Sequence, residues 1–127
     1  MNVIGIGTDI VEVDRLARAL DRFGLALPQR ILAECEYAEF LEALHPERFL
    51  AKRFAAKEAT VKALGTGFRN GLALRQIAVG HDNSGRPRLL FFDAAQAISA
   101  RLGLTAAHLS LSDERHYAVA HVLLMGR

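Results

Sequence analysis

The pattern of apolar and polar positions divides the chain into a mainly helical first half and a second half made mostly of strands. Residues 2–11 alternate apolar and small side chains and are rich in β-branched residues, which predicts a strand that ends near Val11. Apolar residues then recur at helical spacing as far as Phe23, and Gly24 closes the predicted helix. The opposite face of that helix carries three basic residues, Arg15, Arg18 and Arg22.

Two more helices are predicted in the first half. A short one covers residues 34–44, and Pro46 suits the first turn of a longer one that runs to Leu64. The segment Gly65-Thr66-Gly67 ends the long helix, because glycine readily adopts the backbone conformation of a helix C-terminus. It is not a phosphate-binding Walker loop, since no Lys-Ser or Lys-Thr pair follows it and it precedes no helix. The role of helix cap explains these glycines fully, and contact with a ligand would be an addition.

The second half predicts two hairpins and one helix. Strands are predicted at residues 76–81, 88–92, 108–112 and 117–125. The segment Asn83-Ser84-Gly85-Arg86-Pro87 is a strong turn signal, and residues 113–115 form the second turn. Between the hairpins, Asp93 can cap a helix that runs through Leu102 and ends at Gly103. Two hairpins and a first strand predict an α+β fold, a mainly antiparallel sheet packed on helices, in a single domain of residues 1–127.

Composition narrows the class of protein. Half of the 127 residues are hydrophobic (51%) and 24% are charged, which is typical of one soluble globular domain. The net charge of +2 is too small to indicate nucleic acid. Between Arg48 and Arg69, however, six basic residues stand against the single acid Glu58. This local excess favours an anionic ligand or partner, and the alternative is an ordinary solvated helix face.

The cysteine content and the apolar stretches indicate a cytoplasmic protein. Cys35 is the only cysteine, which excludes an internal disulfide and fits a reducing compartment. No apolar stretch approaches the length of a membrane span, and the N-terminus lacks the pattern of a signal peptide. We therefore expect a cytoplasmic location and no association with membranes.

Two acidic residues are candidates for chemistry. Asp9 is a carboxylate inside a predicted strand, which costs several kcal/mol unless the group is paired, hydrogen-bonded or bound to metal. Its alternative role is to cap the helix that follows. Glu58 stands four residues before Lys62 on one helix face, where the default is a surface ion pair worth a few tenths of a kcal/mol. Alanines surround both residues and leave the helix face open to a ligand.

An acid on a strand facing an acid on a helix, with lysines beside it, suits a hard divalent cation bound to phosphate. This combination suggests chemistry on a phosphate ester. The five histidines show no zinc-like spacing. His108 shares a strand face with Ser110 and Ser112, and this polar strip either lines a site or faces water.

The sequence resembles the holo-acyl-carrier-protein synthase family, the small stand-alone 4′-phosphopantetheinyl transferases, over essentially the whole chain. Two segments carry the resemblance, Gly5-Ile6-Gly7-Thr8-Asp9-Ile10-Val11-Glu12 and Phe54-Ala55-Ala56-Lys57-Glu58-Ala59. Further support comes from Gly65-Thr66-Gly67, the 83–87 turn and the segment His108-Leu109-Ser110-Leu111-Ser112. The joint pattern and its spacing are highly specific.

The resemblance implies a reaction and a set of roles. The enzyme would transfer the 4′-phosphopantetheine arm of coenzyme A to a serine of apo acyl carrier protein, releasing adenosine 3′,5′-bisphosphate, for fatty acid biosynthesis. Asp9 and Glu58 would bind Mg²⁺ together with pyrophosphate oxygens, and Lys62 would stabilise charge on the pyrophosphate. The acceptor of the serine proton stays open among Glu58, a metal-bound water and Lys62. Residues resembling those that hold the nucleotide part of coenzyme A are Arg53, Gly65, Asn83, Gly85 and Pro87.

The resemblance also implies partners. The family assembles as a trimer with sites between subunits, so His108 would serve a neighbouring subunit's site. Arg15, Arg18 and Arg22 would dock the acidic helix of the carrier protein. Two other classes compete with this interpretation. One is a non-enzymatic anion-binding module with nucleic acid as one candidate ligand, although the basic helix lacks interleaved aromatics for base stacking. The other is a Mg²⁺-dependent phosphoesterase.

Overall fold

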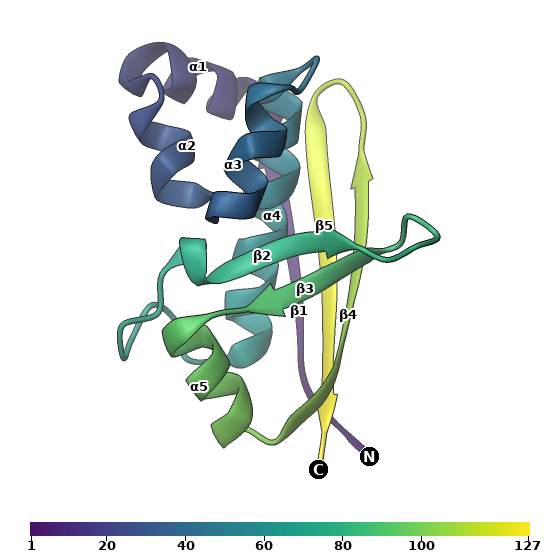
Figure 1. The fold of residues 1–127 in the computed structure, drawn as a ribbon. Coiled ribbons are helices and arrows are strands. Elements are labelled where there is room, and N and C mark those ends of the chain that lie inside the picture. Colours follow the sequence, from purple (N-terminus) through teal and green to yellow (C-terminus); the bar gives the residue numbers. More distant parts are fainter.

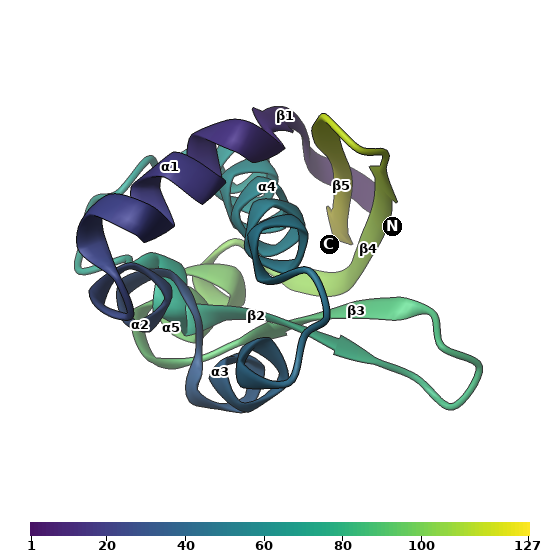
Figure 2. The same cartoon turned by 90° about the horizontal axis from the view of Figure 1, so that it is seen from above.

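A long central helix organises the fold, which the computed structural model describes over residues 1–127. Helix α4 (Pro46–Leu64) has the three-stranded sheet on one side and the remaining helices and a hairpin on the other sides (Figures 1 and 2). The other helices are α1 (Val13–Phe23), α2 (Ala26–Ile31), α3 (Glu34–Leu41) and α5 (Asp93–Arg101), with a 3₁₀ turn at Leu74–Gln76. None of the helices combines the length and the apolar character that crossing a membrane requires.

The strands form two antiparallel sheets. Strands β1 (Asn2–Glu12), β5 (Tyr117–Gly126) and β4 (Leu104–Asp113) make a sheet in the order β1-β5-β4. Strands β2 (Ile77–His81) and β3 (Pro87–Phe91) make a separate two-stranded sheet. The predicted α+β class and antiparallel pairing are confirmed. The antiparallel strands are divided between two sheets, because β2 and β3 pair only with each other.

Several element boundaries differ from the predicted ones. Helix α2 was not predicted, because six residues containing Pro28 are too few to show a helical period. Helix α3 ends at Leu41, three residues earlier than predicted, and β4 begins at Leu104, four residues earlier. Asp93 does not cap α5. The cap residue is Phe92, and no side chain caps the helix. Asp93 is instead the first residue of the helix, and its backbone has an uncommon positive φ of 51°.

Two glycines of β1 allow the strand to lie directly on α4. A Cβ atom on Gly5 would be 1.8 Å from the carbonyl oxygen of Ala63, and one on Gly7 would be 1.9 Å from that of Ala59. No side chain fits between the two backbones at these points. Ala55, Ala56 and Ala59 are fully buried, so small residues line the helix where the core closes around it. Gly5 and Gly7 therefore set how closely β1 approaches α4, the helix that carries Glu58.

We expect Gly7→Ala to destabilise the protein by about 3 kcal/mol, because the new methyl group meets a backbone carbonyl that cannot rotate away. The free energy of unfolding in urea measures the effect. Gly80→Ala is a matched strand control, since its Cβ would meet only the flexible Leu90 side chain at 3.3 Å. Equal losses in the two variants would contradict the importance of the contact between β1 and α4.

Candidate active site

Asp9 and Lys62 meet where β1 crosses α4. The Lys62 Nζ donates a hydrogen bond to Asp9 Oδ1 at 3.0 Å and another to the Thr8 carbonyl oxygen at 2.9 Å. The Asp9 side chain is only 17% exposed, whereas that of Lys62 is 54% exposed. Asp9 lies on the inner face of β1, two residues beyond Gly7, and it does not cap α1, whose cap position is Glu12. The alternative role of helix cap is therefore wrong.

Glu58 lies beside this pair, one helical turn before Lys62. Its burial, and then the negative charge of Asp9, raise the pKa of the Glu58 carboxyl above its ordinary value, while Lys62 and Arg15 oppose this shift. The alternative interpretation, an i, i+4 ion pair between Glu58 and Lys62, is not what the structure shows. The lysine pairs with Asp9 on the neighbouring strand instead. The structure thus brings Asp9, Glu58 and Lys62 together, as predicted.

The donor set of this site suits a hard cation that also carries a phosphate ligand. Two carboxylates lie close enough for one to disfavour ionisation of the other, and a cation between them would relieve that repulsion. No group of three or more His, Cys, Asp or Glu side chains forms a self-sufficient metal site. Mg²⁺ is commonly bound by one or two carboxylates, with waters and substrate phosphates completing its shell. Asp9 and Glu58 fit that requirement.

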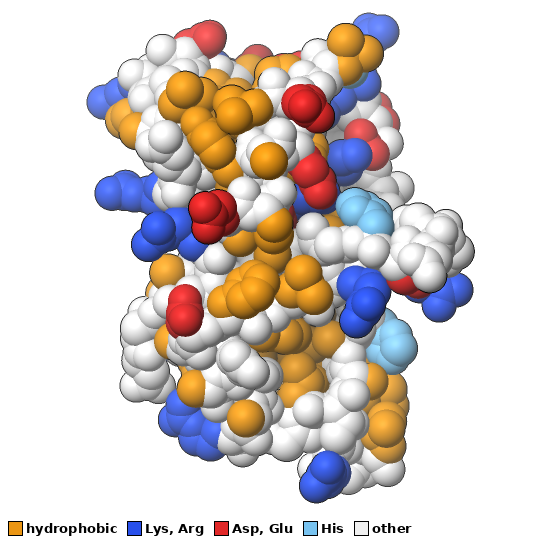
Figure 3. Space-filling model, in the orientation of Figure 1, with side chains coloured by type: hydrophobic (Ala, Val, Ile, Leu, Met, Phe, Trp, Pro, Cys, Tyr) orange, Lys and Arg blue, Asp and Glu red, His pale blue; other side chains and the backbone are white.

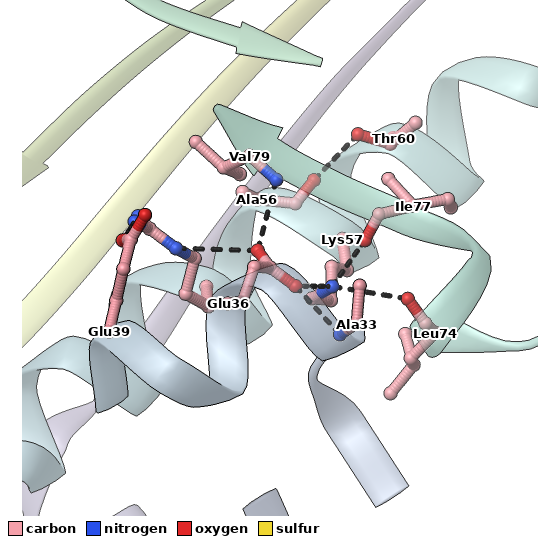
Figure 4. Close-up of polar contacts among 10 residues, drawn as sticks. Ala33, Glu36, Glu39, Ala56, Lys57, Thr60, Leu74, Ile77 and Val79 are labelled. Carbon is pink, nitrogen blue, oxygen red and sulfur yellow. Dashed lines mark hydrogen bonds and ion pairs between the residues drawn. The ribbon is translucent and has the colours of Figure 1, made fainter. Parts of the chain in front are cut away.

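Lys57 and Arg53 face away from this site, which corrects the picture of lysines on both sides of Glu58. The Lys57 side chain is fully buried and its Nζ lies 2.6 Å from Glu36 Oε1 (Figure 4). Arg53 is 5% exposed, with Nε 3.3 Å from Glu36 and an Nη 3.0 Å from Glu39. The local positive field inferred for residues 48–69 is therefore weaker than the sequence indicates.

The other predicted nucleotide-binding residues do not gather around Asp9. Gly65 caps α4 in the left-handed conformation and borders a polar hollow of about 440 Å³, together with Thr66, Gly67, Arg69 and Asn70. Asn83, Gly85 and Pro87 belong to the β2–β3 hairpin, whose turn projects from the body of the protein (Figures 1 and 2).

Asp82 holds the projecting turn in shape. Its Oδ1 accepts hydrogen bonds from the Ser84 backbone N–H, the Ser84 hydroxyl and the Arg86 backbone N–H. The Ser84 hydroxyl bond, and then the Arg86 N–H bond, lower the pKa of Asp82. Sequence reasoning found the turn and missed this aspartate, although an Asp at the first position of a turn is a recognised signal.

The arginines of α1 are all exposed, and they have different partners. Arg18 pairs with Asp14 at 2.6 Å and with Glu12 at 3.7 Å. Arg15 instead lies over the Phe54 ring, with its guanidinium carbon 5.7 Å from the centroid, and Arg22 lies over Phe23 at 5.1 Å. The alternative that Arg15 is paired to Glu12 or Asp14 is therefore wrong. Because Arg15 opposes the raised pKa of Glu58, its charge lies near the site.

An apolar hollow of about 290 Å³ lies next to these arginines, between the end of α1 and the start of α2. Phe23, Ala26, Leu27 and Arg30 line it. The space-filling view shows hydrophobic side chains gathered over α1 and α2, with Lys and Arg side chains at their edge (Figure 3). Phe23 and Leu25 are 54% and 52% exposed, so this surface is apolar and bordered by positive charge.

The chain is similar to known proteins over nearly its whole length. The sequence model of the 4′-phosphopantetheinyl transferase superfamily matches residues 5–121. A holo-[acyl-carrier-protein] synthase of Hamiltonella defensa is 52% identical over 126 residues, which cover 99% of this chain and 100% of the relative. The crystal structure of the holo-[acyl-carrier-protein] synthase of Neisseria meningitidis superposes with a TM-score of 0.92 at 42% identity, covering 98% of this chain and 99% of that one.

A third relative, the holo-(acyl-carrier-protein) synthase of Bacillus anthracis, was solved in complex with coenzyme A (3′,5′-ADP). It superposes with a TM-score of 0.80 at 35% identity, and 98% of each chain is covered. The chain belongs to the 4′-phosphopantetheinyl transferase superfamily. It is accordingly a transferase, and its relatives of known name are synthases of holo acyl carrier protein.

Proposed function

We propose that this enzyme transfers 4′-phosphopantetheine from coenzyme A to a serine of apo acyl carrier protein in a Mg²⁺-dependent reaction. Adenosine 3′,5′-bisphosphate is the leaving product, and the holo carrier serves fatty acid biosynthesis in the cytoplasm. The meeting of Asp9, Glu58 and Lys62 in a member of this superfamily carries the proposal. The coenzyme A complex of the Bacillus anthracis relative supports the choice of donor.

The residues of the site divide the work of phosphoryl transfer. Asp9 and Glu58 would hold the metal ion, which when bound neutralises charge on the pyrophosphate. Lys62, which is 54% exposed and bonded to Asp9, would stabilise charge on the oxygen of the leaving group as its bond to phosphorus breaks. The serine oxygen forms the new bond to that phosphorus. Its proton passes to a base, for which the Glu58 carboxylate, beside Asp9 and Lys62, is one candidate.

The proposal is tested by incubating the protein with coenzyme A, Mg²⁺ and an apo carrier protein, and then measuring the mass of the carrier. A gain of one phosphopantetheine arm supports the transferase. Release of adenosine bisphosphate without that gain would instead indicate a phosphoesterase. If neither product forms, the remaining interpretation is a binding module.

We also propose that the enzyme is a homotrimer with sites shared between subunits. The face of the three-stranded sheet turned away from α4 exposes large apolar side chains among polar ones: Ile6 and Ile10 are 72% and 62% exposed, and they pair in register with Leu123 and Val119. A hollow of about 230 Å³ on this face is lined by residues of all three strands, including His108 and His121. Large apolar side chains exposed together in this way often mark a surface that another protein covers.

A shared site would also explain why the residues predicted to bind the nucleotide part of coenzyme A lie apart from Asp9. His108 lies on the outer face of β4, and the β2–β3 turn projects outward, so neither completes the Asp9 site of its own chain. In a cyclic assembly, such elements can complete the site of a neighbouring copy.

Ile6→Asp is expected to dissociate the trimer and to lower activity strongly, because it buries an unpaired charge in the interface. Sedimentation or light scattering measures the mass at the concentration of the assay. Leu44→Asp is the control, since Leu44 is 87% exposed and lies in the connection between α3 and α4, outside the strands of the sheet. A wild-type protein that is monomeric and fully active would overturn the trimer.

Arg15→Glu is expected to raise the KM for the carrier protein about tenfold and to leave that for coenzyme A nearly unchanged. Charge reversal costs on the order of 1.4 kcal/mol for a tenfold change, within the range of rim charges that steer an acidic partner. The difference from wild type should shrink at high salt. Arg101→Glu on α5, far from α1, is the control (Figure 1). Unchanged carrier KM and salt dependence would exclude Arg15 from docking.

A further inference from the structure

We propose that Lys57 is a positioning residue. Its buried bond to Glu36 fixes the rotation of α4 that directs Glu58 and Lys62 toward Asp9. The inference rests on the proposed function, in which Glu58 binds the metal ion. Lys57 itself is fully buried and its ammonium group is bonded to α3, the 3₁₀ turn and β2, so it acts through the backbone and not through contact with substrate.

The contacts of Lys57 tie α4 to three other segments. Its ammonium group donates to Glu36 Oε1 of α3 at 2.6 Å, to the Leu74 carbonyl at 3.2 Å and to the Ile77 carbonyl at the start of β2 (Figure 4). All three donor positions of the ammonium are therefore used. A lysine held by three acceptors from different elements cannot swing without breaking bonds that nothing else in the core replaces.

Glu36 is equally fixed on its side of the contact. The fully buried carboxylate accepts from the Ala33 backbone N–H at 3.0 Å and from the Val79 backbone N–H at 2.9 Å, besides Lys57 (Figure 4). The first bond anchors it to the start of α3 and the second to β2. The pair therefore has a rigid frame, which a flexible surface ion pair lacks.

The geometry of a helix connects this frame to the site. Successive residues are about 100° apart around the axis, so Lys57 and Ala59 lie about 200° apart, on nearly opposite faces. Ala59 is where Gly7 of β1 touches the helix, and Lys57 is where α3 and β2 hold it. The glycine contact sets how close the helix lies to β1, and the Lys57 bonds set its rotation. Glu58 projects between these two fixed faces.

The polar character of the anchor matters because apolar packing tolerates small rotations that directional hydrogen bonds resist. A buried ion pair is weak evidence for stability, since replacing both partners by apolar residues is often neutral. Reacting groups, in contrast, lose about 100-fold in rate when displaced by about 1 Å. A positioning role therefore predicts a weaker response to Mg²⁺ and a lower kcat, both larger than the change in stability explains.

The test uses the double variant Glu36→Gln/Lys57→Met, which removes both charges at nearly constant volume. Its half-saturating Mg²⁺ concentration should rise about tenfold and its kcat should fall about 10- to 100-fold. Losses of this size are typical when a residue that orients a metal ligand is replaced. The KM for the carrier protein should stay unchanged. Calorimetric titration of coenzyme A with and without Mg²⁺, in the absence of carrier, should show a smaller gain in affinity from Mg²⁺ than in wild type.

A second variant and a control keep the test decisive. Glu36→Gln alone leaves the buried Lys57 ammonium without its counter-charge, so it should be less stable than the double variant and should show the same changes to at least the same degree. Ile98→Ala in α5 removes buried apolar volume away from the pair and should lower the melting temperature without changing half-saturating Mg²⁺ or kcat.

The outcomes separate the two proposals. Wild-type values of kcat, half-saturating Mg²⁺ and Mg²⁺-linked affinity in both Glu36 variants would overturn the positioning role while leaving the proposed function intact. Equal losses in Ile98→Ala would also overturn it, because the effect would then follow stability alone. A wild-type protein that transfers no phosphopantetheine would reject the proposed function and the inference with it.

Discussion

Alanine in place of Asp9 or Glu58 is expected to lower transfer about 1000-fold or more while leaving the fold intact. Each variant leaves one carboxylate where the proposed metal site uses two, and the loss of a single well-placed electrostatic group already costs 100- to 1000-fold in other enzymes. Both side chains lie at the edge of the core, Asp9 17% exposed and Glu58 half-buried, so truncation creates no large cavity.

The measurement is the rate of carrier modification across a range of Mg²⁺ concentrations, with circular dichroism to verify folding. Glu42→Ala is the matched control, because Glu42 is an exposed acid at the end of α3 with no ionic partner. Near-normal turnover of either active-site variant at limiting Mg²⁺ would show that the two acids do not hold the metal.

Lys62→Ala should lower kcat by about two to three orders of magnitude with a smaller change in KM. A lysine that stabilises charge developing on a phosphate acts mainly in the transition state, so its loss appears in turnover. Its bonds to Asp9 and to the Thr8 carbonyl show that its ammonium group already occupies the required side of the helix.

Lys52→Ala provides the comparison on the same helix. Lys52 reaches only Asp113, at 3.9 Å, and its removal should leave kcat unchanged. If Lys62→Ala altered the melting temperature alone, its bond to Asp9 would be a structural ion pair and its catalytic assignment would fail.

The sequence was sufficient for the local features that depend on nearby residues. The long helix with its proline start and glycine end, the first strand, and the 83–87 turn follow from period and turn chemistry. The placing of Asp9 opposite the Glu58 face of α4 followed from two motifs read together. Their meeting depends on Gly5 and Gly7, which were present in the motif but whose contact with α4 was not foreseen.

What could not be predicted depends on partners distant in sequence. Lys57 and Lys62 look alike in the sequence, each beside or near Glu58, yet one is fully buried and the other 54% exposed. Only the position of Glu36, supplied by α3, distinguishes them. Likewise, no local pattern tells whether two hairpins join one sheet, because strand pairing is decided by how the helices between them pack.

The pairing of β1 with β5 has a consequence for how the site comes into existence. Asn2 lies opposite Gly126 and Asp9 opposite Ala120, so the strand that carries Asp9 has its only strand partner more than a hundred residues later in the chain. Closing so long a loop is slow, and during synthesis the first strand must wait for residues 117–126 to leave the ribosome. Helix α4 can form earlier from local contacts alone. The nascent enzyme therefore gains its helical acid and lysine early, and its strand acid takes its place only when the sheet closes.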